Sequence, residues 1–476
     1  MALTAALSGI SHLPSGRKNR RLLRASVTIA ARFLAGRPAR PHSEQPKRGA
    51  TFVNEKSRLH EIRDGFEPAF WIANVTELFE RLSYYAQSAV LAIFLHESLR
   101  LSAQQTGALM GAFGFAVWFL PVLGGSLADR FGFRNSLLFA YLILTLGYFL
   151  MGSLASNWMA PLRDRLPLYW LVFAVLMVPA LGPSLVKPTV AGTTARASSE
   201  AVRSIGYSIY YTLVNVGGML GPIVAYLVRN SLGIENVFRV SAAFVFAMFW
   251  VTLLFYREPS RSNEKPAASV LDALWNMLAV LRNLRFVTFL LIFSGFWVVF
   301  WQEFIALPLY LRGYVNPNAK VDLLLSVDPA TVIALQILLS YATRKLPSFT
   351  AMTLGILIAS FSWLILSAHP TTPFVIASLF ILALGEIMQS PRYYEYVSRL
   401  APPGQQGTYM GYAFLPVAIG YFIAGPLGGY LVHYFGDVLH RPERLWWVIS
   451  GIGFLTALAM WIYNLVVKPI ALADAS

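Results

Sequence analysis

Residues 125–134 read Gly-Ser-Leu-Ala-Asp-Arg-Phe-Gly-Phe-Arg and form a short polar stretch between two long apolar ones. Arg130 and Arg134 suit the cytoplasmic ends of membrane helices, because short cytoplasmic loops are rich in Lys and Arg. Asp129 is placed to accept hydrogen bonds at a helix end, and Gly132 permits a tight reversal of the chain. The stretch therefore predicts two spanning helices that meet on the cytoplasmic side.

The composition of the whole chain agrees with a membrane protein. Of its 476 residues, 56% are hydrophobic and 13% charged, and there is no cysteine. Soluble domains carry about 25% charged residues, so an ordinary soluble enzyme is excluded. The missing cysteines remove disulfides, thiolate metal sites and cysteine nucleophiles.

Twelve apolar stretches exceed the roughly 20 residues that a helix needs to cross a bilayer. They cover residues 67–96, 103–126, 135–155, 167–191, 205–229, 236–256, 285–311, 323–343, 348–368, 372–393, 405–434 and 444–467. The long polar connection follows the sixth stretch. We therefore expect an all-α membrane protein with twelve transmembrane helices in two six-helix halves and both termini cytoplasmic.

The expected domain boundaries follow from this division. Residues 67–256 and 285–468 are the two halves, 257–284 a cytoplasmic linker and 469–476 a C-terminal tail. Residues 1–66 form a basic tail, and residues 1–64 hold +9 of the net charge of +15. The tail has three readings: an organelle transit peptide, a segment that binds anionic lipid, or untranslated upstream sequence. We expect it to be disordered and dispensable.

The first span carries an unusual set of charges. Glu77, Glu80, Arg81 and Tyr84 are spaced so that they share one helical face. A charged side chain at bilayer depth costs at least about 2.5 kcal/mol, so this face must look into protein or a wet cavity. A salt-bridge patch that only locks helices together is the simpler interpretation of the first three residues.

Two other spans add charges at similar depth. Lys187 lies between Pro183 and Pro188, and proline breaks the helical hydrogen-bond ladder and exposes backbone groups. Glu386 lies a little before Pro391. A lone Lys can reach the membrane surface and a lone Glu can pair with a neighbour, but three acids and two cations from three spans together indicate a pathway for a proton and a solute.

The turn between the second and third spans resembles the cytoplasmic loop signature of the major facilitator superfamily. The matching residues are Gly125, Asp129, Arg130, Gly132 and Arg134. The resemblance implies two parallel halves around a midplane cavity, which open alternately to the two sides of the membrane. It also implies a gating role for this loop.

Within that superfamily, the chain resembles the proton-dependent oligopeptide transporter family. Its pattern Glu-x-x-Glu-Arg-Phe-x-Tyr-Tyr matches residues 77–85 with Leu82 in place of Phe, and similarity continues through 186–188, 206–217, 296–297 and 385–411.

The resemblance implies roles for individual residues. The proton-coupling set is Glu77, Glu80, Arg81 and Lys187, with Lys187 also the ion-pair partner and the site for a substrate carboxylate. The resemblance places Asn215 in the cavity wall and Glu386 at the substrate amino group. The full substrate-binding prediction is Tyr84, Tyr85, Lys187, Asn215, Trp297, Trp301, Glu303 and Glu386.

The chain departs from the family at one ion pair. The family has an Arg shortly after the Tyr-Tyr pair and an acid four residues after the seventh-span Trp. Here Ser88 and Trp301 occupy these positions, and Glu303 adds an acid off the expected register. Losing both partners avoids an orphan buried charge but removes one cation that would hold a carboxylate.

These observations predict a secondary active transporter rather than an enzyme: a proton-coupled symporter of di- and tripeptides or peptide-like solutes, with a buried carboxyl group as the proton carrier. The alternatives are a transporter of another small organic solute, such as a drug or organic ion, and a membrane sensor that transports nothing. We expect a monomer in the bacterial inner membrane, with an organelle membrane as the alternative, and no metal, other cofactor or nucleic-acid partner. The sequence contains none of the usual phosphate-loop, zinc or nucleophile-elbow motifs.

Overall fold

The computed structural model describes residues 65–122, 128, 130–200, 202–259, 280–400 and 406–467. All of them belong to one compact unit, Arg58–Ser476. The described residues are almost entirely helical, and their one β feature is an isolated bridge between Phe66 and Ser198. The expected N-terminal and C-terminal tails and most of the linker lie outside the described residues.

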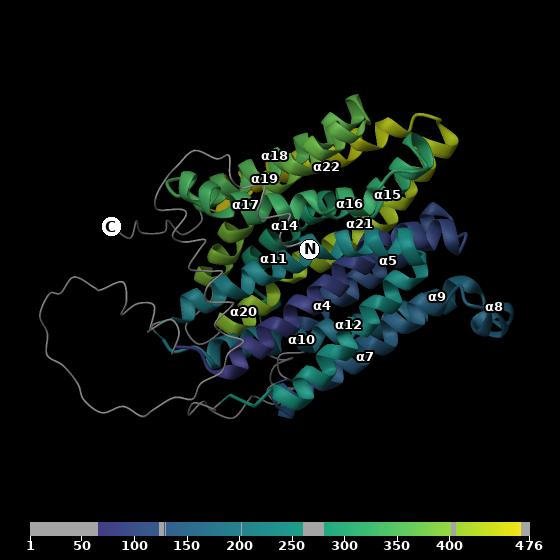
Figure 1. Cartoon of the computed structure of the whole chain (residues 1–476). Helices are drawn as coiled ribbons and strands as arrows, with labels where there is room; N and C mark the ends of the chain where they lie inside the picture. Colours follow the sequence, from purple (N-terminus) through teal and green to yellow (C-terminus); the bar gives the residue numbers. More distant parts are fainter. Residues whose placement is uncertain are drawn as a thin grey trace, which may run out of the picture. The chain divides into compact units, whose positions relative to one another are not determined.

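The N-terminal half supplies six spans, which can be followed by their labels in Figure 1. They are α4 (Pro68–Ile93) with η1 (Phe94–Ser98), α5 (Ala103–Phe119), α7 (Phe133–Ser153), α9 (Leu168–Ala180) with α10 (Gly182–Arg196), α11 (Arg203–Leu232) and α12 (Ile234–Phe255). The short η2 (Asn157–Met159) and α8 (Ala160–Arg165) lie between α7 and α9.

The C-terminal half supplies the other six. They are α14 (Leu284–Phe300) continuing through η3 (Trp301–Glu303), α15 (Ala306–Tyr310) and η4 (Leu311–Val315); α16 (Val321–Leu324) with α17 (Val327–Ala342); α18 (Ser348–Ala368); α19 (Thr372–Leu400); α20 (Gln406–Tyr412) and α21 (Leu415–Val432) with η5 (His433–Val438); and η6 (Pro442–Arg444) with α22 (Leu445–Val467).

Ten of these spans are long and apolar enough to cross a bilayer. The remaining two are α4, which carries several charges, and α5, which has 17 residues. The predicted fold class of twelve transmembrane helices in two six-helix halves is confirmed. Most structural spans begin or end a few residues from the expected bounds, because capping and packing decide where a helix stops.

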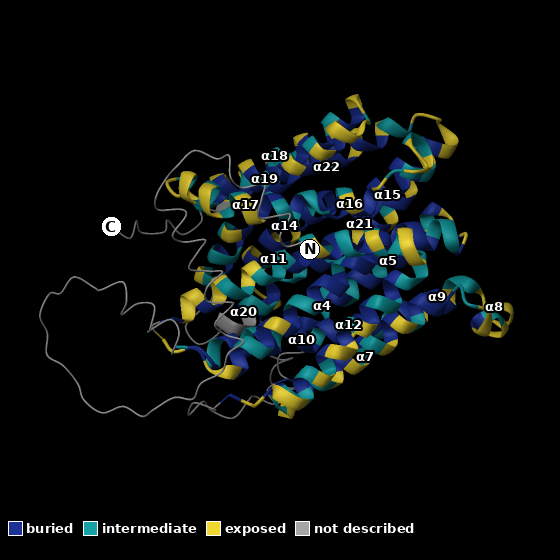
Figure 2. Ribbon diagram, viewed as in Figure 1, coloured by how far each residue is buried: buried dark blue, intermediate teal, exposed yellow. Residues whose placement is uncertain are grey.

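Helix α4 lies in the interior, and Figure 2 shows it buried along most of its length. It packs against α11 and α12 of its own half. By contrast, Leu455 and Val466 on α22 are among many large apolar residues that are exposed. Lipid is the solvent for such a surface, so apolar side chains gather on the outside and polar ones inside.

The two halves meet most extensively where α5 crosses α21. Glycines on both helices permit the approach, since a Cβ added at Gly107 would collide with the carbonyl oxygen of Gly425, and one at Gly429 with that of Ala103. Small residues at a helix crossing let two backbones pack closely in a membrane. These contacts lie in the outer portion of both helices, so they help to close that side.

Candidate functional site

Helix α4 brings its predicted charged residues together inside the N-terminal half. Glu77, Glu80 and Arg81 are all at most 2% exposed. The Arg81 guanidinium forms ion pairs with both carboxylates, at 3.3 Å from its Nε to Oε1 of Glu77 and closer still to Glu80. Its carbon lies 5.1 Å from the centre of the Tyr84 ring. Arg81 is therefore the shared ion-pair partner of two buried carboxylates.

Lys187, on α10, lies within electrostatic range of Glu77 and Glu80. The ion pair expected between Lys187 and these acids is not formed in this conformation. Instead, the Lys187 Nζ lies 3.1 Å from the centre of the Trp118 ring and 5.6 Å from that of Phe414, without a hydrogen-bond partner. Arg81 already neutralises part of the acid charge, and the aromatic faces attract the ammonium.

Trp118 joins the two halves, because it belongs to α5 but contacts aromatic residues of the C-terminal half. Its ring centre lies 5.8 Å from that of Trp301 and 6.2 Å from that of Phe414. The ring centre of Trp301 in turn lies 4.3 Å from that of Tyr421 and 5.9 Å from that of Trp297. The predicted residues Trp297 and Trp301 thus lie in an aromatic wall beside Lys187.

The C-terminal half contains three carboxyl groups within electrostatic range of one another: Glu303 on η3, Asp328 on α17 and Glu386 on α19. Asp328 and Glu386 lie within hydrogen-bonding distance of each other. Among the residues that the structure describes, no Lys, Arg or His forms an ion pair with any of the three. We call these residues the acid triad.

Tyr85 is close to both charged groups. It is within electrostatic range of Arg81 on its own helix and of Glu386 and Asp328 in the other half. Its ring centre is 6.3 Å from that of Phe304, which follows η3. One aromatic residue is therefore close both to the charges of α4 and to the acid triad.

An open cavity of about 720 Å³ lies between α11 and α17. Its lining includes Arg203, Tyr207, Tyr211 and Asn215 from α11 and Val332 and Gln336 from α17. Tyr211 is also within electrostatic range of Glu386 and Asp328, so the inner end of the cavity lies next to the acid triad. The predicted residue Asn215 does line a cavity, and its Nδ2 donates to the Tyr211 carbonyl at 2.9 Å.

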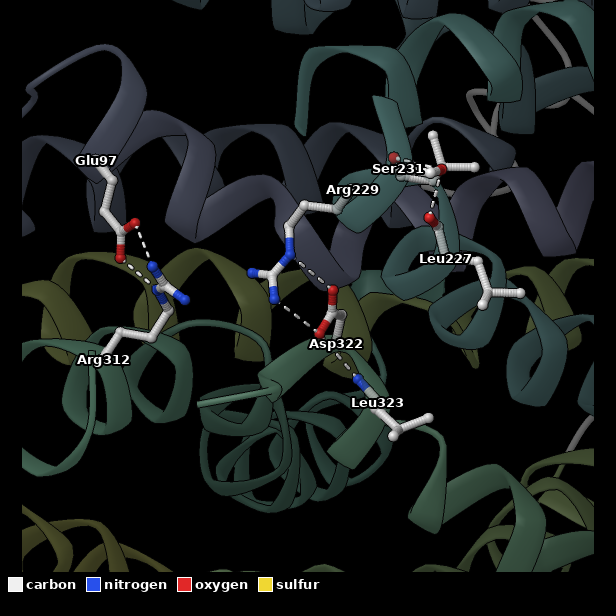
Figure 3. Close-up of polar contacts among 8 residues, drawn as sticks. Glu97, Leu227, Arg229, Ser231, Arg312, Asp322 and Leu323 are labelled. Atoms are coloured by element: carbon white, nitrogen blue, oxygen red, sulfur yellow. Dashed lines mark hydrogen bonds and ion pairs between the residues drawn. The ribbon is translucent and has the colours of Figure 1, made fainter. Parts of the chain in front are cut away.

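Two ion pairs join the halves at the outer ends of the helices, away from the opening of the cavity (Figure 3). Arg229 on α11 lies 3.1 Å, Nε to Oδ2, from Asp322 on α16. Arg312 on η4 holds the Glu97 carboxylate in a two-point contact, with Nη2 donating to Oε2 at 2.8 Å. With these pairs closed and the cavity starting at Arg203, the conformation is closed outside and open toward the cytoplasm.

The cytoplasmic loop is described only in part. Gly125 and Asp129 lie outside the described residues. Gly132 adopts a positive φ of 83° directly before α7, as a tight reversal requires. The α7 N-terminus is capped by the Glu258 carboxylate, which accepts from the backbone N–H of Phe133 at 2.7 Å and of Arg134 at 2.9 Å. Arg130 is exposed.

Comparison with known proteins identifies the fold family. The family model of the Major Facilitator Superfamily matches residues 75–415 and, in a second match, residues 319–474. The chain belongs to the major facilitator superfamily.

Curated major facilitator relatives are about one quarter identical. An uncharacterised transporter of this superfamily, YqjV of Bacillus subtilis (strain 168), is 24% identical over 404 residues, which is 82% of this chain and 92% of that protein. The multidrug resistance protein MdtH of Sodalis glossinidius (strain morsitans) is 25% identical over 388 residues, 80% of this chain and 89% of that one.

Solved structures share the major facilitator fold at low identity. A POT family transporter in complex with 5-aminolevulinic acid has a TM-score of 0.66 and 16% identity over 83% of this chain and 95% of its own. The POT family transporter PepTSo gives 0.68 and 17%, covering 84% and 98%. The nucleoside transporter NupG gives 0.70 and 13%, covering 83% and 99%. The fold that the resemblance implied is therefore confirmed.

Two site residues of this major facilitator protein were not predicted from its sequence. Asp328 had a usable signal, because an acid inside an apolar span is costly and marks a functional position. Trp118 had none, since its place over Lys187 depends on how α5 packs against α10 and the other half. The outer ion pairs were also missed, because their partners lie far apart in the sequence.

Proposed function

We propose that the chain is a proton-coupled symporter that moves small peptides or peptide-like solutes by alternating access. The observation that carries the proposal is a pair of opposite charges without partners. The Lys187 ammonium in one half, and Oε2 of Glu303 and Oδ1 of Asp328 in the other, are buried and have no hydrogen-bond partner. A solute with an amino group and a carboxylate would satisfy both, because buried charges need partners.

The carboxyl groups of α4 are the proposed proton carriers. The histidines in the described part of the chain, His96, His369, His433 and His440, lie at or just beyond the outer helix ends, away from the cluster. Protonating Glu80 or Glu77 weakens its attraction to Arg81 and Lys187, so Lys187 becomes available to an anionic group of the solute. Release of the proton and solute inside restores the original charge balance.

The membrane potential adds to this driving force. One positive charge that moves inward through 100 mV gains about 2.3 kcal/mol. Each coupled proton can therefore raise the attainable solute ratio by about fiftyfold. No other cofactor is required by this scheme.

Several further assignments belong to the proposal. The transporter acts as a monomer in the cell membrane, with halves at 67–256 and 285–468 joined by a cytoplasmic linker. Tyr84, Trp297 and Trp301 help to form the wall of the solute site. The loop at 125–134 acts as a cytoplasmic gate.

The test is uptake of labelled dialanine into proteoliposomes with an inside-negative, outside-acid gradient. Wild-type uptake should rise with the gradient, and Glu80→Gln, Glu77→Gln and Lys187→Ala should each lose that rise. Glu443→Gln is the matched control, because Glu443 lies in the surface turn η6. Gradient-driven uptake that is unchanged in all three variants would refute the coupling scheme.

A second candidate is transport of a drug or organic cation. It is favoured by the matches to proteins named for multidrug resistance and by the acid triad, which has no cation partner among the described residues. Uptake or export of a cationic dye by a folded protein that does not transport dialanine would support this candidate. No response to any solute in such a panel would instead favour a sensor that transports nothing.

A further inference from the structure

The acid triad brings three carboxyl groups together, and one amino group can balance the charge of only one carboxylate. Two carboxyl groups that hydrogen-bond to each other, as Asp328 and Glu386 are placed to do, share one proton between them. With Glu303 as a third acid, the triad can carry up to two negative charges when cations enter to balance them. The described neighbours offer no cation to balance them, unlike on α4, where Arg81 pairs with both acids.

Two carboxyl groups of the triad each have a buried oxygen without a hydrogen-bond partner. Glu303 is 1% exposed and Asp328 5%, and Oε2 of Glu303 and Oδ1 of Asp328 have no hydrogen-bond partner. A buried oxygen of this kind costs free energy until a donor reaches it. The two oxygens therefore point to a ligand with more than one N–H donor.

The surroundings of the triad also suit cations. Tyr85, Tyr211 and Tyr394 all lie within electrostatic range of Glu386. Aromatic rings attract ammonium and guanidinium groups through their faces. Tyr211 lines the cavity between α11 and α17, and Val332, one helical turn after Asp328, lines it too. A solute in the cavity can thus reach the triad.

We propose that the acid triad is a site for two positive charges at one end of the solute, so that the preferred solutes carry a side-chain amine or guanidinium beside their amino group. This inference rests on the proposed function for the way in which the solute is carried, but the charge requirement comes from the triad alone. Peptides that begin with Lys or Arg, and short diamines, are the chemical class that fits.

The test compares two dipeptides that differ in one charge. Lys-Ala and norleucyl-Ala have side chains of similar length, but only Lys carries a side-chain ammonium. Binding is measured by stabilisation of the purified full chain and by competition with labelled dialanine in proteoliposomes. Wild type should bind Lys-Ala about tenfold more tightly, as expected for hydrogen bonds between charged groups.

Two variants assign the preference to the triad. Asp328→Asn and Glu303→Gln should each reduce the Lys-Ala preference to less than about threefold, while norleucyl-Ala binding stays near the wild-type value. Glu443→Gln should keep the full preference. Thermal unfolding of each variant shows whether it is folded. Two independent variants are used so that the test still stands if one of them does not fold.

Three results would overturn the inference. They are equal affinity of wild type for the two dipeptides, a preference that survives both substitutions, and a preference lost equally in Glu443→Gln. If no dipeptide binds, the proposed peptide function fails while the triad is still tested by 1,4-diaminobutane against butylamine. A diamine preference that requires Asp328 supports the triad, and equal binding or no binding of the two amines refutes it.

Discussion

The outer ion pair between Arg229 and Asp322 should hold the chain in its cytoplasm-open conformation. Asp322 is fully buried, and the Arg229 side chain is only 14% exposed. Breaking a buried pair by removing one partner costs about 3 kcal/mol at the low end of the usual range. Asp322→Asn should therefore shift the equilibrium toward the outward-open state by about a hundredfold.

The second outer pair provides a matched control. Glu97 is 39% exposed and Arg312 20%, so water screens their attraction. An exposed pair contributes at most about 1 kcal/mol. Glu97→Gln should consequently shift the same equilibrium by no more than about fivefold. The contrast between the two variants comes from burial alone, since each replaces a carboxylate with an amide of the same shape.

The absence of cysteine from the sequence makes the measurement direct, because labels can be placed without removing native thiols. Spin labels at Leu166 and Asn318 report the outer side, and labels at Glu200 and Lys345 the inner side; all four positions are exposed. Distances between the spin labels are measured in nanodiscs by double electron–electron resonance. In Asp322→Asn the distance between the two outer labels should increase and that between the two inner labels should decrease. The double variant with Arg229→Gln should shift no further, since the two residues act as one unit. Unchanged distances, or equal shifts in the two amide variants, would refute the reasoning.

Four further outcomes follow from the described contacts. Gly107→Val should prevent the close crossing of α5 and α21, because its side chain would collide with the Gly425 carbonyl; the same outer spin-label pair would then separate, and an unchanged distance would contradict this view. Gly132→Ala should destabilise the protein by about 1 kcal/mol, owing to its positive φ, as measured by chemical unfolding of the purified protein. Glu258→Gln should cost about 1 kcal/mol in the same assay, since the charged cap on α7 is lost, and a stability equal to wild type would argue against the cap. Trp118→Leu should remove the aromatic face beneath Lys187 and alter the solute affinity without changing the spans, as shown by binding and circular dichroism.

The sequence was sufficient to predict the spans because a spanning helix needs only length and hydropathy. It also predicted that Glu77, Glu80 and Arg81 share a face, because positions three and four apart lie together on a helix. Lys187 and Glu386 were predicted as charges inside apolar spans, and the family resemblance added their roles. The structure places each beside other buried charges. Their proposed roles remain predictions.

The sequence by itself therefore determined the membrane class, the number of spans and the charged face of α4, since each depends on local spacing along one segment. Only the tertiary structure decided that Lys187 lies on Trp118, that Asp328 joins Glu303 and Glu386, and that Arg229 meets Asp322. These partners are brought together by how helices pack. No local pattern of residues records which helix faces which, and so the charge balance of the site and the closure of the outer side could be seen only after folding.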